Sequence, residues 1–353
     1  MIEQSTLFET MTKEATSDGR LAQLFELKNQ HGMRAVFMDI GATWLSCKVP
    51  VKGQLREVLL GQSTMADFLE QQSYMGVTVG RYANRIANGQ FKIDGIKHQV
   101  ETNQAGNTLH GGPEGFNKRR WNVVEVTENS VEFGLVSSDG DQGFPGDLDV
   151  TVKYQLTNDN EVAISYKAKT NKTTPINLTN HAYFNLLGAD SEHLGIDHIL
   201  SVNSQEFVPT TECGIPKGQW KRVKNTNFDF TSPKVISQDF MLDKDQEKVK
   251  GYDHSFVLDK SCSKGESAAS LTSPDSLVTM HVFTTKPAIQ LYTGNWLAGT
   301  PNRVGGEYQD YSGIALETQF LPDALNHPEW DHPSTILQPN ETYQHQTCYQ
   351  FIV

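Results

Sequence analysis

Two side chains able to transfer protons stand inside otherwise strand-like parts of the sequence. His181 lies in the run NLTNHAYFNL (residues 177–186), among asparagine and tyrosine side chains. Glu317 follows three apolar residues in the run IALE (residues 314–317). Asn, His and Tyr together supply hydrogen-bond donors and acceptors suited to a hydroxyl-rich ligand. These residue types indicate acid–base chemistry on a polar molecule.

The hypothesis is that Glu317 and His181 form a pair. A carboxylate in an apolar strand faces the core at a high cost unless it has a partner. The ordinary pKa values of Glu and His are about 4.3 and 6.5. Near neutral pH one group can therefore accept a proton while the other, partly protonated, donates one. Taken alone, His181 is interpreted equally well as a hydrogen-bonded structural histidine.

Other polar clusters could complete a binding site. They are GRYANRIANG (80–89) with Arg85, NTLHGGP (107–113) with His110, GYDH (251–254) with Asp253, and AIQLY (288–292) with Gln290. The glycines after His110 would let a backbone approach a ligand closely. Each cluster also has a structural interpretation: solvated loop arginines, a loop histidine, a turn aspartate and an outward-facing glutamine.

Several other chemistries lack their sequence patterns. The available His and Glu residues have no HExxH or CxxC spacing, which disfavours a metal site. A GxSxG elbow for a nucleophilic serine is missing, and GRxxxR lacks the lysine and glycine spacing of a phosphate loop. A glycosidase needs two carboxylates, and only Glu317 is evident. We therefore expect no metal and no cofactor.

The elements that must position these groups are expected to be β-strands. Residues 148–156 and 162–168 alternate apolar and polar side chains around an Asn158–Asn160 loop, which predicts a β-hairpin with one buried face. Residues 43–49, 131–135 and 278–282 alternate similarly. Thr64–Gln72 is the best helical segment, with a capping box at its start. The expected fold is all-β, a large and mostly antiparallel β-sandwich with few short helices.

The chain is expected to be one domain spanning residues 1–353, because no linker or repeat divides it. Residues 1–20 are expected to be a loosely held N-terminal lead-in. The serine-rich segment Ser261–Pro274 is expected to be a flexible insertion.

Composition narrows the class of partner. The net charge of −12 disfavours contact with nucleic acid and with anionic lipid. We find no secretory signal in Met1–Arg20 and no apolar window of about 18 residues that could span a membrane. The four cysteines are scattered without a CxxC pair, which favours reduced thiols in the cytoplasm.

Seven ordered blocks, from about Phe25 to the C-terminus, resemble the aldose 1-epimerases (galactose mutarotases). They are GRYANRIANGQF, NTLHGGPEGFNKRRW, DGDQGFPG, NLTNHAYFNL, VKGYDHSF, IQLYTGN and ALETQFLPDALNHPEW. The resemblance implies a galactose mutarotase-like β-sandwich. It also implies His181 as general acid and Glu317 as general base. The substrate-binding residues that it implies are Asn84, Arg85, His110, Asp253 and Gln290.

The activity implied by the resemblance is that of an isomerase. It would interconvert the α and β anomers of free hexoses such as galactose and glucose by acid–base catalysed ring opening and reclosure. No cofactor is needed, and a monomer or weak homodimer suffices. Two alternatives stay open: a sugar-phosphate epimerase, for which Lys118, Arg119 and Arg120 are the candidate phosphate cluster, and a non-catalytic carbohydrate-binding module.

Overall fold

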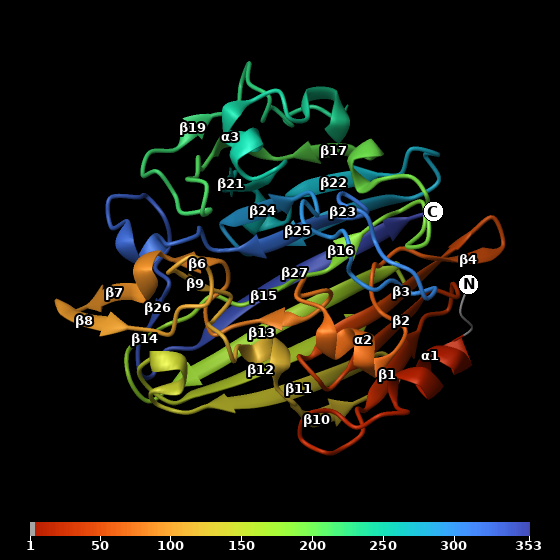
Figure 1. The fold of residues 1–353 in the computed structure, drawn as a ribbon, viewed down its shortest axis with the longest axis horizontal. Coiled ribbons are helices and arrows are strands. Elements are labelled where there is room, and N and C mark those ends of the chain that lie inside the picture. Colours follow the sequence, from red (N-terminus) through yellow and green to blue (C-terminus); the bar gives the residue numbers. More distant parts are fainter. Residues whose placement is uncertain (1–3) are drawn as a thin grey trace.

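The computed structural model describes residues 4–353, and antiparallel β-sheets dominate it (Figure 1). The largest sheet has nine strands, in the order β10 (Asn122–Val126), β11 (Ser130–Ser137), β12 (Leu148–Leu156), β13 (Glu161–Thr170), β27 (Tyr343–Ile352), β23 (Thr279–Thr284), β22 (Ala269–Thr272), β17 (Ile199–Val202) and β20 (Lys234–Val235). The predicted hairpin is confirmed as β12 and β13, with Leu148 opposite Thr170 and Leu156 opposite Val162.

Two further sheets lie against the largest one. The six-stranded sheet runs in the order β16 (Tyr183–Phe184), β25 (Ile314–Gln319), β24 (Ala288–Tyr292), β21 (Asp253–Leu258), β18 (Ser204–Phe207) and β19 (Lys221–Arg222). The four-stranded sheet contains β1 (Leu24–Lys28), β2 (Arg34–Met38), β3 (Thr43–Val51) and β4 (Gln54–Glu57). The remaining strands form the pairs β5 (Thr78–Val79) with β15 (Thr179–Asn180), β6 (Arg85–Ile86) with β9 (Thr108–Leu109), β7 (Gln90–Ile93) with β8 (Ile96–Gln99), and β14 (Thr174–Pro175) with β26 (Ile336–Leu337).

Helices are few and short, as the sequence predicts. They are α1 (Gln4–Met11), α2 (Met65–Glu70) and α3 (Lys244–Lys248), with single 3₁₀ turns at Ala87–Gly89, Phe116–Lys118, Asp141–Gly143, Gly195–Asp197, Ile236–Asp239, Cys262–Lys264 and Ala324–Asn326. The Thr64 hydroxyl caps α2 by accepting from the Asp67 backbone N–H. None of the helices in residues 4–353 is long and apolar enough to cross a membrane.

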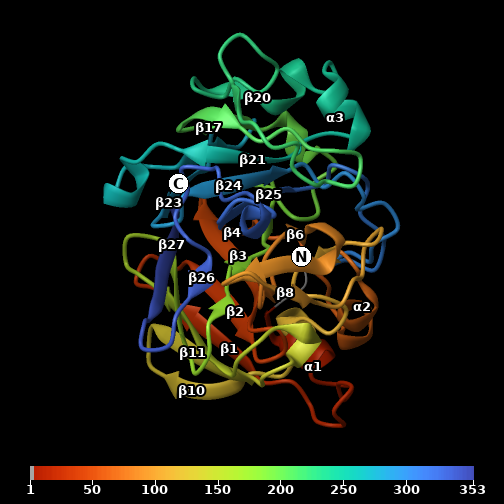
Figure 2. The same ribbon diagram turned by 90° about the vertical axis from the view of Figure 1, so that its left-hand side faces the viewer.

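One apolar core joins the three sheets and confirms the β-sandwich. The Tyr154 ring of the nine-stranded sheet stacks on Phe37 of the four-stranded sheet at 4.4 Å. Tyr349 of the same large sheet lies 5.2 Å from Phe184 of the six-stranded sheet. Figure 2 shows β27 and β11 on one side of the molecule, and β6, β8 and α2 on the other.

The expectation of a loosely held lead-in is wrong for the part that the structure describes, residues 4–20. Leu7 and Met11 lie one turn apart on α1, and both are buried in a cluster with Met38 and Phe68. The polar composition of the segment hides this apolar face, whose i, i+4 spacing is that of a helix packed on a core. Residues 1–3 lie outside the described residues.

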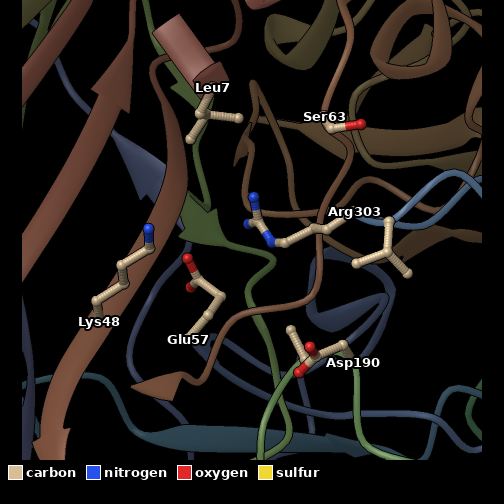
Figure 3. A pocket seen from close by; sticks show the side chains of 8 residues that line it. Leu7, Lys48, Glu57, Ser63, Asp190 and Arg303 are labelled. Carbon is tan, nitrogen blue, oxygen red and sulfur yellow. The ribbon is translucent and has the colours of Figure 1, made fainter. Parts of the chain in front are cut away.

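Helix α1 also covers a small cavity beneath it (Figure 3). Leu7 lies over the cavity, whose charged walls include Lys48, Glu57 and Arg303. Glu57 accepts the backbone N–H of Cys47 at 2.7 Å, and Arg303 donates its Nε–H to the Leu59 carbonyl at 3.0 Å. The N-terminal helix is therefore part of the folded unit.

The expectation of a flexible insertion at Ser261–Pro274 is also wrong. Residues 269–272 form β22, which pairs with both β17 and β23 inside the nine-stranded sheet. Ala269 and Leu271 are buried, whereas the Ser270 hydroxyl lies 2.7 Å from that of Ser201 on the outer face. The period-two alternation of buried and outward-facing side chains therefore predicts the structure of residues 269–272 better than the serine content does.

Lys286 is an unusual member of the core. It lies in the connection from β23 to β24, and its side chain is buried, with Nζ hydrogen-bonded to the Tyr343 hydroxyl. Nζ also lies 4.4 Å from the ring centroid of Tyr343 and 4.8 Å from that of Phe320. Burial lowers the pKa of Lys286 well below its usual value, so the fold favours the neutral amine.

We expect Lys286→Met to raise the free energy of unfolding by about 1–3 kcal/mol at pH 7, because an apolar chain replaces a desolvated amine. In wild type the folded-state pKa of Lys286 lies below the unfolded value. The unfolded chain binds more protons between these two pKa values, so stability rises with pH there. Urea unfolding at pH 7 and pH 9 measures both quantities. A destabilised variant that keeps the wild-type pH slope would contradict this expectation.

Candidate active site

The register of the six-stranded sheet brings His181 and Glu317 together. Tyr183 of β16 pairs with Ala315 of β25 in an antiparallel ladder. Counting two residues back along one strand and two forward along the other places His181 opposite Glu317. The His181 Nε2 atom lies 3.5 Å from Glu317 Oε1, and the two side chains are only 5% and 3% exposed.

The pair lines a cleft of about 840 Å³, a size typical of small-molecule sites. The predicted residues Asn84, Arg85, His110 and Asp253 line it too, and they come from β6, β9 and β21 or the segments beside them. All of these segments lie far apart in the sequence. The cleft is thus a product of the tertiary fold.

Burial shifts the pKa values of the pair in opposite directions. It lowers the pKa of His181 to about 4 and raises that of Glu317 well above its usual value. Aromatic rings surround this site: the ring centroids of Tyr183, Tyr74 and Tyr292 lie 4.9, 6.0 and 6.3 Å from that of His181. A carboxylate with an imidazolium holds the same number of protons as a carboxylic acid with a neutral imidazole. Burial therefore favours the form of the singly protonated pair in which both groups are neutral, a carboxylic acid beside a neutral imidazole.

His110 presents a hydrogen-bond donor to the same space. Its Nδ1 atom accepts the backbone N–H of Asn84 at 3.1 Å, and burial lowers its pKa well below the usual value. A neutral imidazole that accepts at Nδ1 carries its proton on Nε2. His110, His181 and Glu317 place ligand atoms within 4.8 Å of one another. The Nε2–H of His110 nevertheless suits a substrate oxygen rather than a cation.

The glycines after His110 serve packing. Gly111 has a φ of +89°, and a Cβ atom there would lie 2.1 Å from the Gly80 carbonyl oxygen. The chain reversal therefore needs glycine. The reversal packs the His110 loop against the start of the segment that carries Arg85. The sequence predicts that these glycines let the backbone approach a ligand, but the close approach at Gly111 is to the backbone of Gly80.

Three side chains accept hydrogen bonds from the edges of the Arg85 guanidinium group. Its Nε donates to Gln104 at 2.8 Å, Nη1 to Asn84 Oδ1 at 3.3 Å, and Nη2 to Asp253 Oδ2 at 3.4 Å. The side chain is 11% exposed. Two of its five N–H groups are left for a ligand.

Gln290 takes a different place from the other predicted binding residues. It is buried on β24 opposite Glu317, and it donates from Nε2 to Asp253 Oδ1 at 2.6 Å. In this structure its amide therefore orients Asp253 from behind the cleft wall.

The basic side chains of segments 80–89 and 118–120, apart from Arg85, make structural contacts away from the cleft. Arg81 is not solvated: it is buried and donates to the Pro145 and Gly146 carbonyls and to Ser137. Lys118 pairs with a glutamate, Arg119 with Asp141, and Arg120 with aspartates 18 and 39. These three cations lie outside the cleft lining, so they do not supply a phosphate site there.

Sequence reasoning missed several residues of the cleft, among them Tyr74, Gln104 and Trp296. Gln104 stands in the turn that leads to the His110 block, and the Ala105-Gly106 turn signal could have placed it near that loop. Trp296 follows the IQLYTGN block directly. Tyr74 has a φ of +57°, a strained conformation that no local pattern indicates.

Comparison with known proteins agrees with this geometry. A sequence model of the aldose 1-epimerase family matches residues 23–350. The chain is 50% identical over 351 residues to an aldose 1-epimerase of Haemophilus influenzae, covering 99% of this chain and 100% of that one. It is 46% identical over 342 residues to the aldose 1-epimerase of Escherichia coli K12, covering 97% and 98%. The solved structure of an aldose epimerase homologue from C. elegans superposes with a TM-score of 0.86 at 30% identity, covering 94% and 99%.

Proposed function

The chain belongs to the aldose 1-epimerase family, and from this premise we propose that it interconverts the α and β anomers of free hexoses such as galactose and glucose. The observation that carries the proposal is the His181–Glu317 pair, whose facing atoms lie 3.5 Å apart in the cleft. The anomeric hydroxyl and the ring oxygen are bonded to the same carbon. A base and an acid at this spacing can reach both oxygens at once.

In the proposed reaction Glu317 removes the proton of the C1 hydroxyl while His181 protonates the ring oxygen. The bond between C1 and the ring oxygen breaks, and the open-chain aldehyde forms. Rotation about C1–C2 presents the other face of the carbonyl group, the ring recloses, and both proton transfers reverse. The pair then holds the same single proton as at the start, so the cycle needs no cofactor.

The other cleft residues bind and polarise the sugar. The His110 Nε2–H and the two free N–H groups of Arg85 would donate to sugar oxygens and stabilise developing negative charge. Asp253 would accept a sugar hydroxyl, with Gln290 holding it in place. Asn84 orients both His110 and Arg85.

The cleft is built from one chain, which supports action as a monomer or weak homodimer. Cys47, Cys213, Cys262 and Cys348 are unpaired, which supports a cytoplasmic location.

Polarimetry tests the function. Freshly dissolved α-glucose and α-galactose should reach their equilibrium rotation faster with the purified protein than in buffer alone, and xylose and arabinose define the substrate range. A carbohydrate-binding module would bind sugar, measured by calorimetry, without accelerating mutarotation. A sugar-phosphate epimerase would accelerate the mutarotation of glucose 6-phosphate and leave the rate for free glucose at its value in buffer. Either result would overturn the proposal.

The pH profile tests the proton count of the pair. We expect kcat/KM to fall as the pH drops through about 4, because burial lowers the pKa of His181 to about 4. Below that pH the pair holds two protons, and no base remains. Tryptophan fluorescence would verify that the protein stays folded there. An acid limb near the ordinary histidine pKa of about 6.5 would contradict the expectation.

A further inference from the structure

A loop that does not line the cleft approaches the face of the Arg85 guanidinium group. The loop joins β18 to β19 and is drawn in green above β6 in Figure 1. A Cβ atom on Gly214 would lie 2.4 Å from Arg85 Cζ and 2.6 Å from both Nε and Nη1. Since the central carbon is the nearest atom, this approach is perpendicular to the plane of the group.

Backbone hydrogen bonds close the loop into a tight unit. Thr211 donates to the Ile215 carbonyl at 2.8 Å, Gly214 to Thr211 at 2.9 Å, and Lys217 to Pro209 at 2.9 Å. Gly214 itself adopts a left-handed conformation with a φ of +73°. The loop therefore presents a fixed peptide surface to Arg85.

We propose that Gly214 is a positioning residue that fixes where the Arg85 guanidinium lies along the direction perpendicular to its own plane. Asn84, Gln104 and Asp253 hold the edges of the group, and they restrain it within its own plane. Gly214 blocks movement perpendicular to that plane on one side. The proposal rests on the proposed function, in which Arg85 binds and polarises the sugar.

The absence of a Gly214 side chain is the essential feature. With a methyl group at this position, either the loop or the arginine has to move. The loop is closed by three backbone hydrogen bonds, whereas the guanidinium is the end of a flexible side chain. Arg85 is therefore the group that yields, and its guanidinium leaves its place in the cleft wall while the fold persists.

Gly214→Ala is expected to lower kcat/KM for galactose mutarotation about 10- to 100-fold, since a displacement of about 1 Å in a positioned group has effects of this size. Gly218→Ala is the matched control. Gly218 lies in the same connection with a φ of +92°, but an added Cβ atom there would meet no atom within 4 Å. Alanine at Gly218 introduces the same kind of left-handed backbone strain as alanine at Gly214. Because the added methyl group displaces no neighbour, the Gly218 variant should keep its activity within about twofold of wild type. Equal losses in the two variants would overturn the proposal.

A double variant separates positioning from a general structural effect. In an Arg85→Ala background, Gly214→Ala should cause no further loss, because the displaced group is already gone. Additive losses would overturn the proposal. If Gly214→Ala alone fails to fold, the double variant should fold again, and its failure to do so would count equally against the proposal.

A crystal structure of Gly214→Ala gives an answer that does not depend on activity. We expect the Arg85 guanidinium to have moved and its bond to Gln104 to be broken, with the 209–217 loop in place. Arg85 in its wild-type position with all three side-chain bonds would overturn the proposal. If wild type failed to accelerate mutarotation, the proposed function would fall, and this structure would still decide the role of Gly214.

Discussion

Glu317→Gln is expected to lower kcat for galactose mutarotation by at least about 10³-fold while leaving the affinity for sugar nearly unchanged. Glutamine has the shape of glutamate and fills the same buried position on β25. Its amide cannot accept the proton of the C1 hydroxyl at neutral pH. A positioned general base contributes about 10²–10⁴-fold. Glu317 faces the acid directly, so its removal should cost an effect in the upper part of this range.

Polarimetry gives the rate, and titration calorimetry with galactose gives the dissociation constant. Glu307→Gln is the matched control, because Glu307 is an exposed carboxylate on the rim of the same cleft. It should retain the wild-type rate. Normal interconversion of α- and β-galactose by Glu317→Gln would remove Glu317 as the base, whatever its effect on binding.

The sequence predicts the proposed catalytic pair because each member breaks the local pattern around it. A carboxylate among the apolar residues 314–316 needs a buried partner, and His181 stands in a run that is otherwise strand-like. The actual proximity depends on the pairing of β16 with β25. That register is a long-range feature that periodicity within either segment does not contain.

Residues that act through packing are much harder to predict. Gly214 and Gln104 touch Arg85 from loops that join it only in the folded chain, and glycine and glutamine are common in loops. Lys286 appears from the sequence to be one more polar residue before a proline. Only the three-dimensional arrangement reveals its burial among aromatic rings.

In two segments the amino-acid composition gives the wrong prediction, whereas the spacing of apolar residues gives the right one. The serine content of Ser261–Pro274 suggested flexibility, although Ala269 and Leu271 have the spacing of a strand with one buried face. The polar character of residues 4–20 likewise hides Leu7 and Met11. In both segments two apolar residues at the right period determine the structure, because burial of those side chains stabilises the element against its entropic cost.

His181→Asn is expected to lower kcat by about 10²–10⁴-fold, the contribution of a positioned general acid. Asparagine keeps a hydrogen-bond donor in the cleft, so sugar binding should persist, but its amide does not release a proton to the ring oxygen. The effect should not add to that of Glu317→Gln, since each transfer requires the other. A double variant that is slower than both single variants by the product of their losses would contradict concerted transfer.

The pH dependence of the same variant identifies the residue behind the acid limb. If His181 is responsible, the residual activity of His181→Asn should no longer fall as the pH drops through about 4. His332→Asn is the matched control, because burial also lowers the pKa of His332 to about 4, yet this residue lies outside the cleft lining. It should keep both the wild-type rate and the acid limb. A limb that disappears in His332→Asn and persists in His181→Asn would assign the titration to a residue outside the cleft lining, and the acid role of His181 would have to be abandoned.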